Sequence, residues 1–271
     1  MNNKQILEDA QYAINNVPIV YQYSSVEGAK AMLENLTLLV KNPSKFNDPY
    51  DCDLDLITFN SASKFKLEEA IKNYNKKRHP QKHKSISEFA NLSKEEIIDA
   101  FKNKVFPAYA KTIGVTCFSE LNDNMLMWSH YTYSHKGVCI GFNLIELYRQ
   151  LSKSYPGQIS MIKVNYTNEY KQEDYFDDIY SSIFHWIRTK SENWAYEKEI
   201  RFLFINQNLD KNLNKFVKFD KSKIMEIFLG SKMEKNDEFY FINYCKKNIP
   251  NAKIYKMRKE EKSFNLIPEL I

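Results

Sequence analysis

The chain has 271 residues, 43% of them hydrophobic and 14% aromatic, which is enough for one sizeable core, and no Pro/Gly/Ser-rich linker divides it. Its net charge of +5 is spread along the sequence, unlike the dense basic stripe of a dedicated duplex-DNA binder. The four cysteines lie far apart, the start is polar, and no apolar run approaches the ~20 residues of a membrane helix. We therefore expect a single domain, 1–271, in the cytoplasm and without membrane contact.

The first part of the chain predicts two strands with a helix between them. Residues 19–23 and 37–40 have strand character, and the serine pair at 24–25 can cap the helix that follows the first strand. Asn47-Asp48-Pro49 is a turn sequence, because Asn and Asp side chains hydrogen-bond to nearby backbone and Pro fixes φ. Residues 46–50 are therefore expected on a loop.

The pattern turns helical over residues 61–111, which we interpret as a helical insertion. Two helices are expected there, the second opened by a capping box from Ser93 to Glu96. Between them lies a basic run at 76–84, which is typical of a solvated loop, although a phosphate-binding arm is an alternative.

The remainder predicts more strands than helices. An amphipathic helix is expected over 176–187, and a β-α-β unit with two parallel strands over 224–257. Further strands are predicted at 114–118, 137–142, 162–166 and 199–205. The sequence thus indicates an α+β fold with a mixed, mainly antiparallel sheet, flanking helices and the helical insertion.

Two carboxylates and a guanidinium recur along the strand that begins near residue 199. A period of two places Glu197, Glu199 and Arg201 on one face and apolar side chains on the other. A carboxylate held there could bind ribose hydroxyls, stabilise an oxocarbenium-like cation or act as a general base, while Arg201 keeps it ionised or binds phosphate. The alternative is an exposed strand end with an ordinary cross-strand salt bridge.

A second polar and aromatic group lies between Cys117 and His135. On a helical turn, Trp128 and Tyr131 could share a face and stack on a planar base or on nicotinamide. Ser129, His130 and Tyr131 offer donors for phosphate or ribose. The alternative is that Trp128 belongs to the core and His130 is a satisfied buried histidine. A zinc site is not expected, because no Cys or acid lies near the two histidines at ligand spacing.

Residues from most of the chain carry a family resemblance. They are Tyr21-Gln22-Tyr23, Phe46 to Pro49, Cys117 to Ser119, Met127 to Tyr131, His135 to Gly137, Gly141-Phe142, Lys190, and Trp194 to Arg201. In this ordered set the chain resembles the bacterial family known as domain of unknown function 2971. Gln22 departs from the pattern, in which we expect a basic residue between the two tyrosines.

More weakly, the order of three motifs resembles that of ADP-ribosyltransferases: a strand near Tyr21, a Ser or Tyr near residue 130, and a Glu-x-Glu, here Glu197-Lys198-Glu199. This resemblance implies that Glu199 holds the nicotinamide ribose and stabilises the oxocarbenium-like cation. It also implies that Glu197 orients the acceptor and that Tyr131 or Trp128 stacks on nicotinamide. The His or Arg of the first motif is not present here.

The resulting hypothesis is an NAD-dependent ADP-ribosyltransferase or NAD glycohydrolase, acting as a toxin or an anti-phage effector on an unknown protein or nucleic-acid acceptor. The expected catalytic residues are Glu199 and Glu197. The expected nucleotide-binding residues are Tyr21, Tyr23, Asn47, Asp48, Ser119, Trp128, Ser129, His130, Tyr131, Lys190 and Arg201. A non-catalytic sensor or adaptor that binds a nucleotide or a protein in the same pocket is the alternative. A third is a metal-dependent nuclease built on Asp51, Asp53 and Asp55.

Overall fold

The computed structural model describes residues 3–76 and 92–271, and its main element is one large mixed sheet. The strand order is β11-β2-β4-β1-β5-β12-β13-β14, and β10 pairs with β4 and β6. Nearly all of these pairs are antiparallel, whereas β12 and β13 are parallel and are joined by a helix, as the predicted β-α-β unit requires. The predicted α+β class is confirmed.

The elements have the following bounds. The strands of the large sheet are β1 (Ile19–Ser24), β2 (Thr37–Lys41), β4 (Gly114–Ser119), β5 (Val138–Asn143), β6 (Ile159–Lys163), β10 (Glu199–Phe204), β11 (Asn214–Lys218), β12 (Ile224–Leu229), β13 (Lys253–Lys259) and β14 (Leu266–Leu270). Two small parallel pairs join β3 (Ile57–Thr58) to β8 (Glu173–Asp174) and β7 (Asn165–Thr167) to β9 (Thr189–Ser191). The helices are α1 (Asn3–Asn16), α2 (Val26–Asn35), α3 (Lys64–Lys76), α4 (Lys94–Ala100), α5 (Phe106–Ala110), α6 (Met125–Tyr131), α7 (Leu144–Ser154), α8 (Ile179–Arg188) and α9 (Lys235–Asn248). None of the helices in the described ranges is long and apolar enough to cross a membrane.

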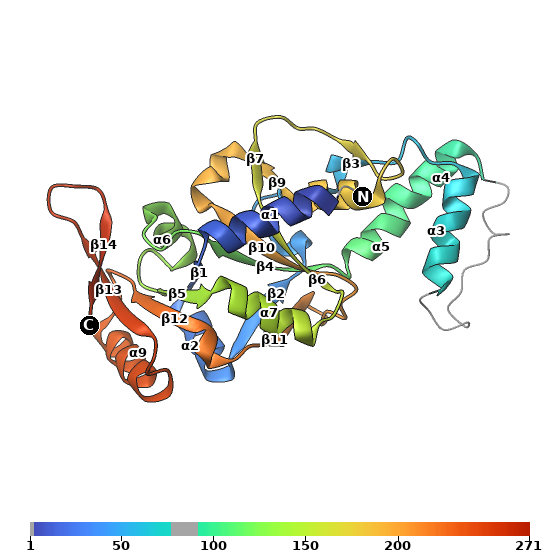
Figure 1. Ribbon diagram of the computed structural model, residues 1–271. Helices are drawn as coiled ribbons and strands as arrows, with labels where there is room; N and C mark the ends of the chain where they lie inside the picture. The colour runs from blue at the N-terminus through green and yellow to red at the C-terminus, as the bar shows by residue number, and fades with distance from the viewer. Residues whose placement is uncertain (1–2, 77–91) are drawn as a thin grey trace.

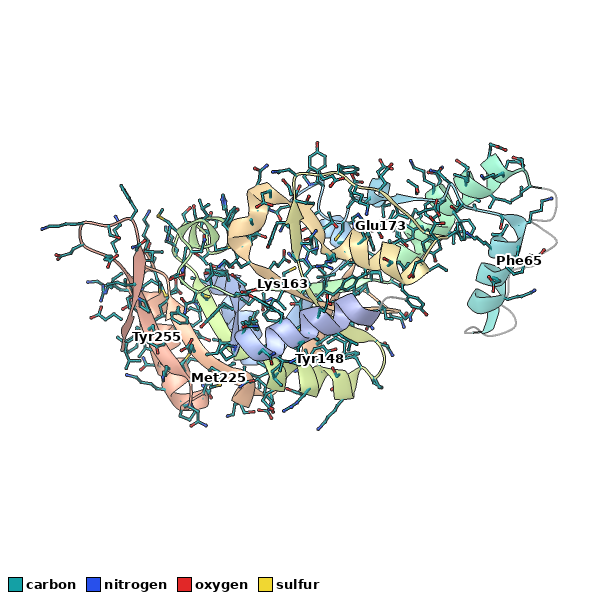
Figure 2. The ribbon with its side chains drawn as sticks, turned by 45° about the horizontal axis from the view of Figure 1, so that its top comes forward. Phe65, Tyr148, Lys163, Glu173, Met225 and Tyr255 are labelled. Carbon is teal, nitrogen blue, oxygen red and sulfur yellow. The ribbon has the colours of Figure 1, made fainter. Side chains whose placement is uncertain are left out.

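Each face of the sheet has its own apolar core. On one face, α1 and α7 lie across the strands (Figure 1), and Tyr148 of α7 (Figure 2) packs edge-on against Phe202 of β10 with ring centroids 5.4 Å apart. The core of the other face receives side chains from α8 and from the helices between 64 and 110. Helices α3, α4 and α5 extend toward one end of the molecule (Figure 1). Phe101 and Phe106 from this region are nevertheless buried with the strand residue Val115.

Local capping explains where several helices begin. Ser25 accepts a hydrogen bond from the Gly28 amide at the start of α2, and Ser93 with Glu96 forms the predicted capping box of α4. The predicted helix at 176–187 begins later, at Ile179, because the Asp178 side chain caps it and leaves Phe176 outside.

Among the elements of the structure that were not predicted are α1, α7, β11 and β14. Helix α1 is mostly polar, and Ala13 is buried on it. Helix α7 follows β5 directly, with Asn143 as its N-cap, so no loop separates the strand pattern from the helical pattern in the sequence. Most of the basic run at 76–84 lies outside the described residues.

The large sheet divides at β4, and this division positions the site. On one side, β10 pairs with β4 along its whole length, from Gly114 to Ser119. On the other side, β1 meets β4 only at Ser119 and β2 meets it only at Val115. Among the described strands, none pairs with Cys117 on that side, and its carbonyl accepts a long 3.5 Å hydrogen bond from the Gln22 side chain instead. Strands β1 and β2 therefore leave a gap above the middle of β4.

Candidate functional site

A cavity of about 890 Å³ lies at this gap. Its walls come from β1, α2, β2, β11 and α6, and β4 contributes the residues from Val115 to Ser119. One part is lined by charged side chains, namely Asp51, Lys190, Glu197 and Glu199. A volume in this range suits a small-molecule ligand.

Arg201 binds two of the carboxylates in the charged part of the cavity, Asp51 and Glu199. Its side chain is fully buried, and each of its five N–H donors has an acceptor. Nε and Nη2 donate to the two oxygens of Glu199, both at 2.9 Å. Nη1 and Nη2 donate to the two oxygens of Asp51, at 2.9 and 2.6 Å, and Nη1 also donates to the Ile187 carbonyl at 2.6 Å. The guanidinium lies 5.3 Å from the centroid of the Phe46 ring. Phe46 lines the cavity, whereas Arg201 does not.

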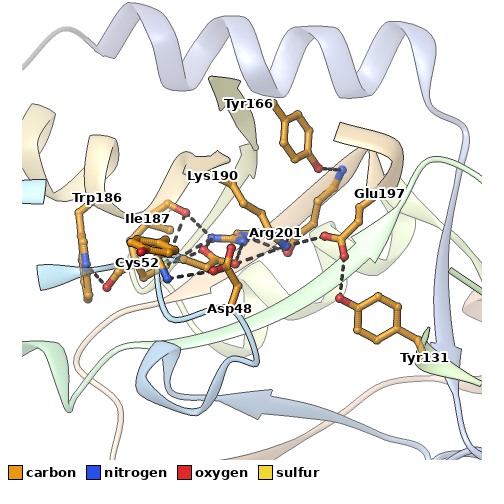
Figure 3. Close-up of polar contacts among 12 residues, drawn as sticks. Asp48, Cys52, Tyr131, Tyr166, Trp186, Ile187, Lys190, Glu197 and Arg201 are labelled. Atoms are coloured by element: carbon orange, nitrogen blue, oxygen red, sulfur yellow. Dashed lines mark hydrogen bonds and ion pairs between the residues drawn. The ribbon is translucent and has the colours of Figure 1, made fainter. Parts of the chain in front are cut away.

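Lys190 links the carboxylates to one another (Figure 3). Its Nζ lies 2.5 Å from Glu197 Oε2, 3.2 Å from Glu199 Oε2 and 3.4 Å from Asp51 Oδ2. Strand β9 presents Lys190 beside Tyr166 of β7, whose hydroxyl accepts a 2.9 Å hydrogen bond from the Glu199 amide. We call Asp51, Lys190, Glu197, Glu199 and Arg201 the buried ion cluster.

The buried ion cluster holds three carboxylates and two cations, so with all groups charged it carries one net negative charge. Burial alone would raise the pKa of Glu199, but the charges of Arg201 and Lys190 outweigh it and lower that pKa. Burial raises the pKa of Glu197, and the opposing charge of Lys190 does not cancel this effect. The pKa values of the two carboxyls are therefore shifted in opposite directions.

Glu197 is also the carboxylate with spare acceptor capacity. Its Oε1 accepts a 2.6 Å hydrogen bond from the Tyr131 hydroxyl and its Oε2 accepts from Lys190, which leaves about two of four acceptor positions open. Glu199 already accepts three hydrogen bonds from Arg201 and Lys190.

The predicted strand face is only partly correct. Glu199 and Arg201 share a face of β10 and Ile200 takes the other, as expected, but Glu197 ends the 3-10 helix η6 (Glu192–Glu197). Lys198, in the left-handed region with φ 42°, then turns the chain into β10. The alternative of an exposed strand end is wrong, because every residue of β10 is buried.

Residues 127–202 match the model of a family described as protein of unknown function (DUF2971). The predicted resemblance to DUF2971 is confirmed over this segment. No curated protein and no solved structure matches the chain. The matched segment supplies four members of the buried ion cluster, and Asp51 comes from outside it.

The cavity brings together most of the residues predicted from sequence. Those that line it are Tyr21, Tyr23, Asn47, Ser119, His130, Tyr131, Lys190, Glu197 and Glu199. Ser119 holds the Glu197 backbone by donating to its carbonyl at 2.7 Å. His130 is exposed, so the alternative of a buried histidine is wrong.

Four predicted binding residues do not line the cavity. Trp128 is fully buried between Tyr23 and the C-terminal strands, and its indole donates to the Asn122 carbonyl, so stacking on nicotinamide is wrong for this residue and the core alternative is correct. Ser129 lies on the exposed face of α6. Asp48 is buried and accepts from the Tyr50 amide within its own turn, and Arg201 is covered by Phe46.

The three aspartates considered for a nuclease do not converge. Asp51 binds Arg201, Asp53 accepts from Tyr170, and Asp55 pairs with Lys102 on the insertion. Sequence reasoning therefore missed the actual role of Asp51 as the third carboxylate of the buried ion cluster. Its position two residues after the predicted turn at 47–49 was the available signal.

Within the matched segment, the turn after α6 is strained. Tyr133, Ser134 and His135 all have positive φ, at 53°, 59° and 69°. The turn is held by backbone hydrogen bonds, including His135 N–H to the Trp128 carbonyl at 3.1 Å. Gly137 is required beside it, because a Cβ there would lie 2.0 Å from the Ser24 carbonyl oxygen. Such strain persists where the surroundings fix it, and here it orients the end of α6 that carries Tyr131.

Proposed function

We propose that the cavity binds NAD and that the protein cleaves its nicotinamide–ribose bond, as an ADP-ribosyltransferase or an NAD glycohydrolase. The observation that carries the proposal is Glu197, a carboxyl with a raised pKa that borders the cavity and is held by Lys190 and Tyr131.

The charge of the site suits this reaction. As nicotinamide leaves with the bonding electron pair, positive charge develops on the ribose, and a nearby net negative charge stabilises it. Glu199 stays ionised because Arg201 and Lys190 hold it. Glu197 accepts the proton of the attacking water or acceptor hydroxyl, because its pKa lies closer to neutrality. The sequence-based hypothesis gave the main catalytic role to Glu199 and the orientation of the acceptor to Glu197. In the present proposal Glu197 reacts, and Glu199 positions Lys190.

The proposal extends to a biological setting. An enzyme that consumes or transfers ADP-ribose from NAD would act as a toxin or an anti-phage effector inside the cytoplasm. A transferase would need a protein or nucleic-acid acceptor at the mouth of the cavity, whereas a glycohydrolase needs only water.

One observation favours a second candidate, a nucleotide sensor without catalysis. Glu197 and Glu199 are both almost fully buried and already accept hydrogen bonds inside the protein. In a sensor, the same cavity would bind the nucleotide, and replacing Glu197 would alter affinity without any turnover to lose.

The test is the incubation of purified protein with NAD, with nicotinamide release and the ligand-induced rise of Tm measured together. Wild type should release nicotinamide and Glu197→Gln should not, although it still binds. Glu192→Gln is the matched control, because Glu192 lies on the same 3-10 helix but is exposed and away from the cavity. A Tm rise without nicotinamide release supports the sensor. If NAD causes neither a Tm rise nor nicotinamide release, NAD is rejected as the ligand.

A further inference from the structure

A second wall of the cavity has a character different from the buried ion cluster. It is formed by β2 and β11, which pair so that Leu39 lies directly opposite Phe216. Because side chains alternate along strands, Leu38 and Val217 point into the core, while Leu39 and Phe216 line the cavity. This wall therefore presents an apolar platform to the cavity.

Phe216 is the unusual member of the platform. It is 61% exposed although it sits on a regular strand. An exposed aromatic ring on a cavity wall has a face available for a planar ligand, and stacking on such a ring contributes binding energy with any nucleobase.

Lysines surround this platform. Lys41, Lys45 and Lys218 line the same cavity. Lys218 donates to the Asn35 carbonyl at 2.8 Å, which holds its ammonium group near the end of α2. Within the described parts of the chain, neither Lys41 nor Lys45 makes an ion pair, so their charges are available to a ligand.

We propose that this wall is a subsite for the adenosine diphosphate half of a dinucleotide, with the adenine ring on Phe216 and the phosphates beside Lys41 and Lys45. The inference rests on the proposed function and extends it. Its physical basis is that the cavity has a negative part and a positive part. NAD has the same division, since its nicotinamide ring is cationic and its pyrophosphate is anionic. The buried ion cluster would attract the first and the lysines the second.

The test uses two overlapping fragments of NAD as separate probes, with affinities measured by calorimetry: ADP-ribose, which lacks nicotinamide, and nicotinamide mononucleotide, which lacks the adenosine phosphate. Phe216→Ala should raise the Kd for ADP-ribose by about tenfold, the scale of one lost stacking contact. It should leave the Kd for nicotinamide mononucleotide nearly unchanged. Phe239→Ala is the matched control, because Phe239 is exposed on α9 and lies outside the cavity.

Lys41→Ala tests the phosphate contact independently. The substitution should raise the Kd for ADP-ribose more than the Kd for adenosine, and it should reduce the salt dependence of ADP-ribose binding. Lys111→Ala, at an exposed lysine outside the cavity, should do neither.

The subsite and the proposed function fail in different ways. If wild type releases nicotinamide but Phe216→Ala and Lys41→Ala bind ADP-ribose as tightly as wild type, the subsite is wrong and the reaction stands. If ADP-ribose binds and both variants weaken it, but no nicotinamide is released, the subsite stands and the reaction is wrong. Failure of wild type to bind ADP-ribose would overturn the subsite directly.

Discussion

Replacing Arg201 should destabilise the protein strongly and in a pH-dependent way. Arg201→Met removes a fully buried cation that satisfies Asp51 and Glu199 through four hydrogen bonds and the Ile187 carbonyl through a fifth. Three buried carboxylates would then share Lys190 alone. Removing one partner of a buried ion pair costs about 3–5 kcal/mol, because the remaining charge is left uncompensated, and we expect a loss of that size at pH 7.

The sign of the pH dependence follows from Glu199. Its pKa is lowered in the folded wild type, so its ionisation adds stability above the ordinary carboxyl pKa of about 4.3, and that stability is lost as the pH falls below this value. Without Arg201 this contribution largely disappears. The difference between wild type and Arg201→Met should therefore narrow at pH 3.5.

Urea unfolding at pH 7 and pH 3.5 measures this difference. Arg201→Lys keeps the charge but cannot bind two carboxylates bidentately, so it should fall between wild type and Arg201→Met and remain folded if the latter does not. Arg149→Met is the control, because Arg149 makes an exposed pair with Glu146 and should change stability by less than about 1 kcal/mol. A loss below about 1 kcal/mol for Arg201→Met at pH 7, or an equal loss at both pH values, would refute the reasoning.

Three further predictions concern the strained turn and Glu197. Ser134→Gly should raise stability by up to about 1 kcal/mol in thermal unfolding, because glycine adopts positive φ without strain; a clear loss would show that the turn is not strained. Tyr131→Phe removes a hydrogen bond that lowers the pKa of Glu197, so that pKa should rise and the acid limb of the pH–rate profile should move to higher pH; an unmoved limb would exclude Glu197 as the titrating base. Glu197→Gln should be as stable as wild type or more stable at pH 7, since a raised pKa means that the ionised carboxylate opposes folding; a loss above about 2 kcal/mol in urea unfolding would contradict this.

Strong local patterns allowed the core of the fold to be predicted. The alternation in β10 and the apolar runs of β1, β4 and β5 are typical of strands in a sheet with two covered faces, and the β12-α9-β13 unit follows from the spacing of its elements. Helix α1 was not predicted from its mostly polar sequence, and it packs against β6 and α7. Lys163 of β6 (Figure 2), for example, lies 3.2 Å from the centroid of the Tyr12 ring.

The candidate site was harder to predict because its distances are set by the whole fold. Lys190 and Glu197 were identified from their motifs, but the pairing of Arg201 with Asp51, 150 residues earlier, depends on how the loop after η1 (Pro43–Lys45) folds back. Trp128 illustrates the opposite case: its spacing from Tyr131 suggested a shared face, yet Tyr131 reaches Glu197 while Trp128 packs against Tyr23. Periodicity locates a side chain on its helix and leaves open what that helix packs against.

The most direct measurement of the central claim compares nicotinamide release from NAD by wild type, Glu197→Gln and Glu199→Gln, together with the Tm of each. We predict that Glu197→Gln keeps its Tm and loses release, because it removes the reacting carboxylate. We predict that Glu199→Gln lowers the Tm, because it leaves Arg201 and Lys190 undercompensated. Release that persists in Glu197→Gln would contradict the assignment of the reaction to this residue.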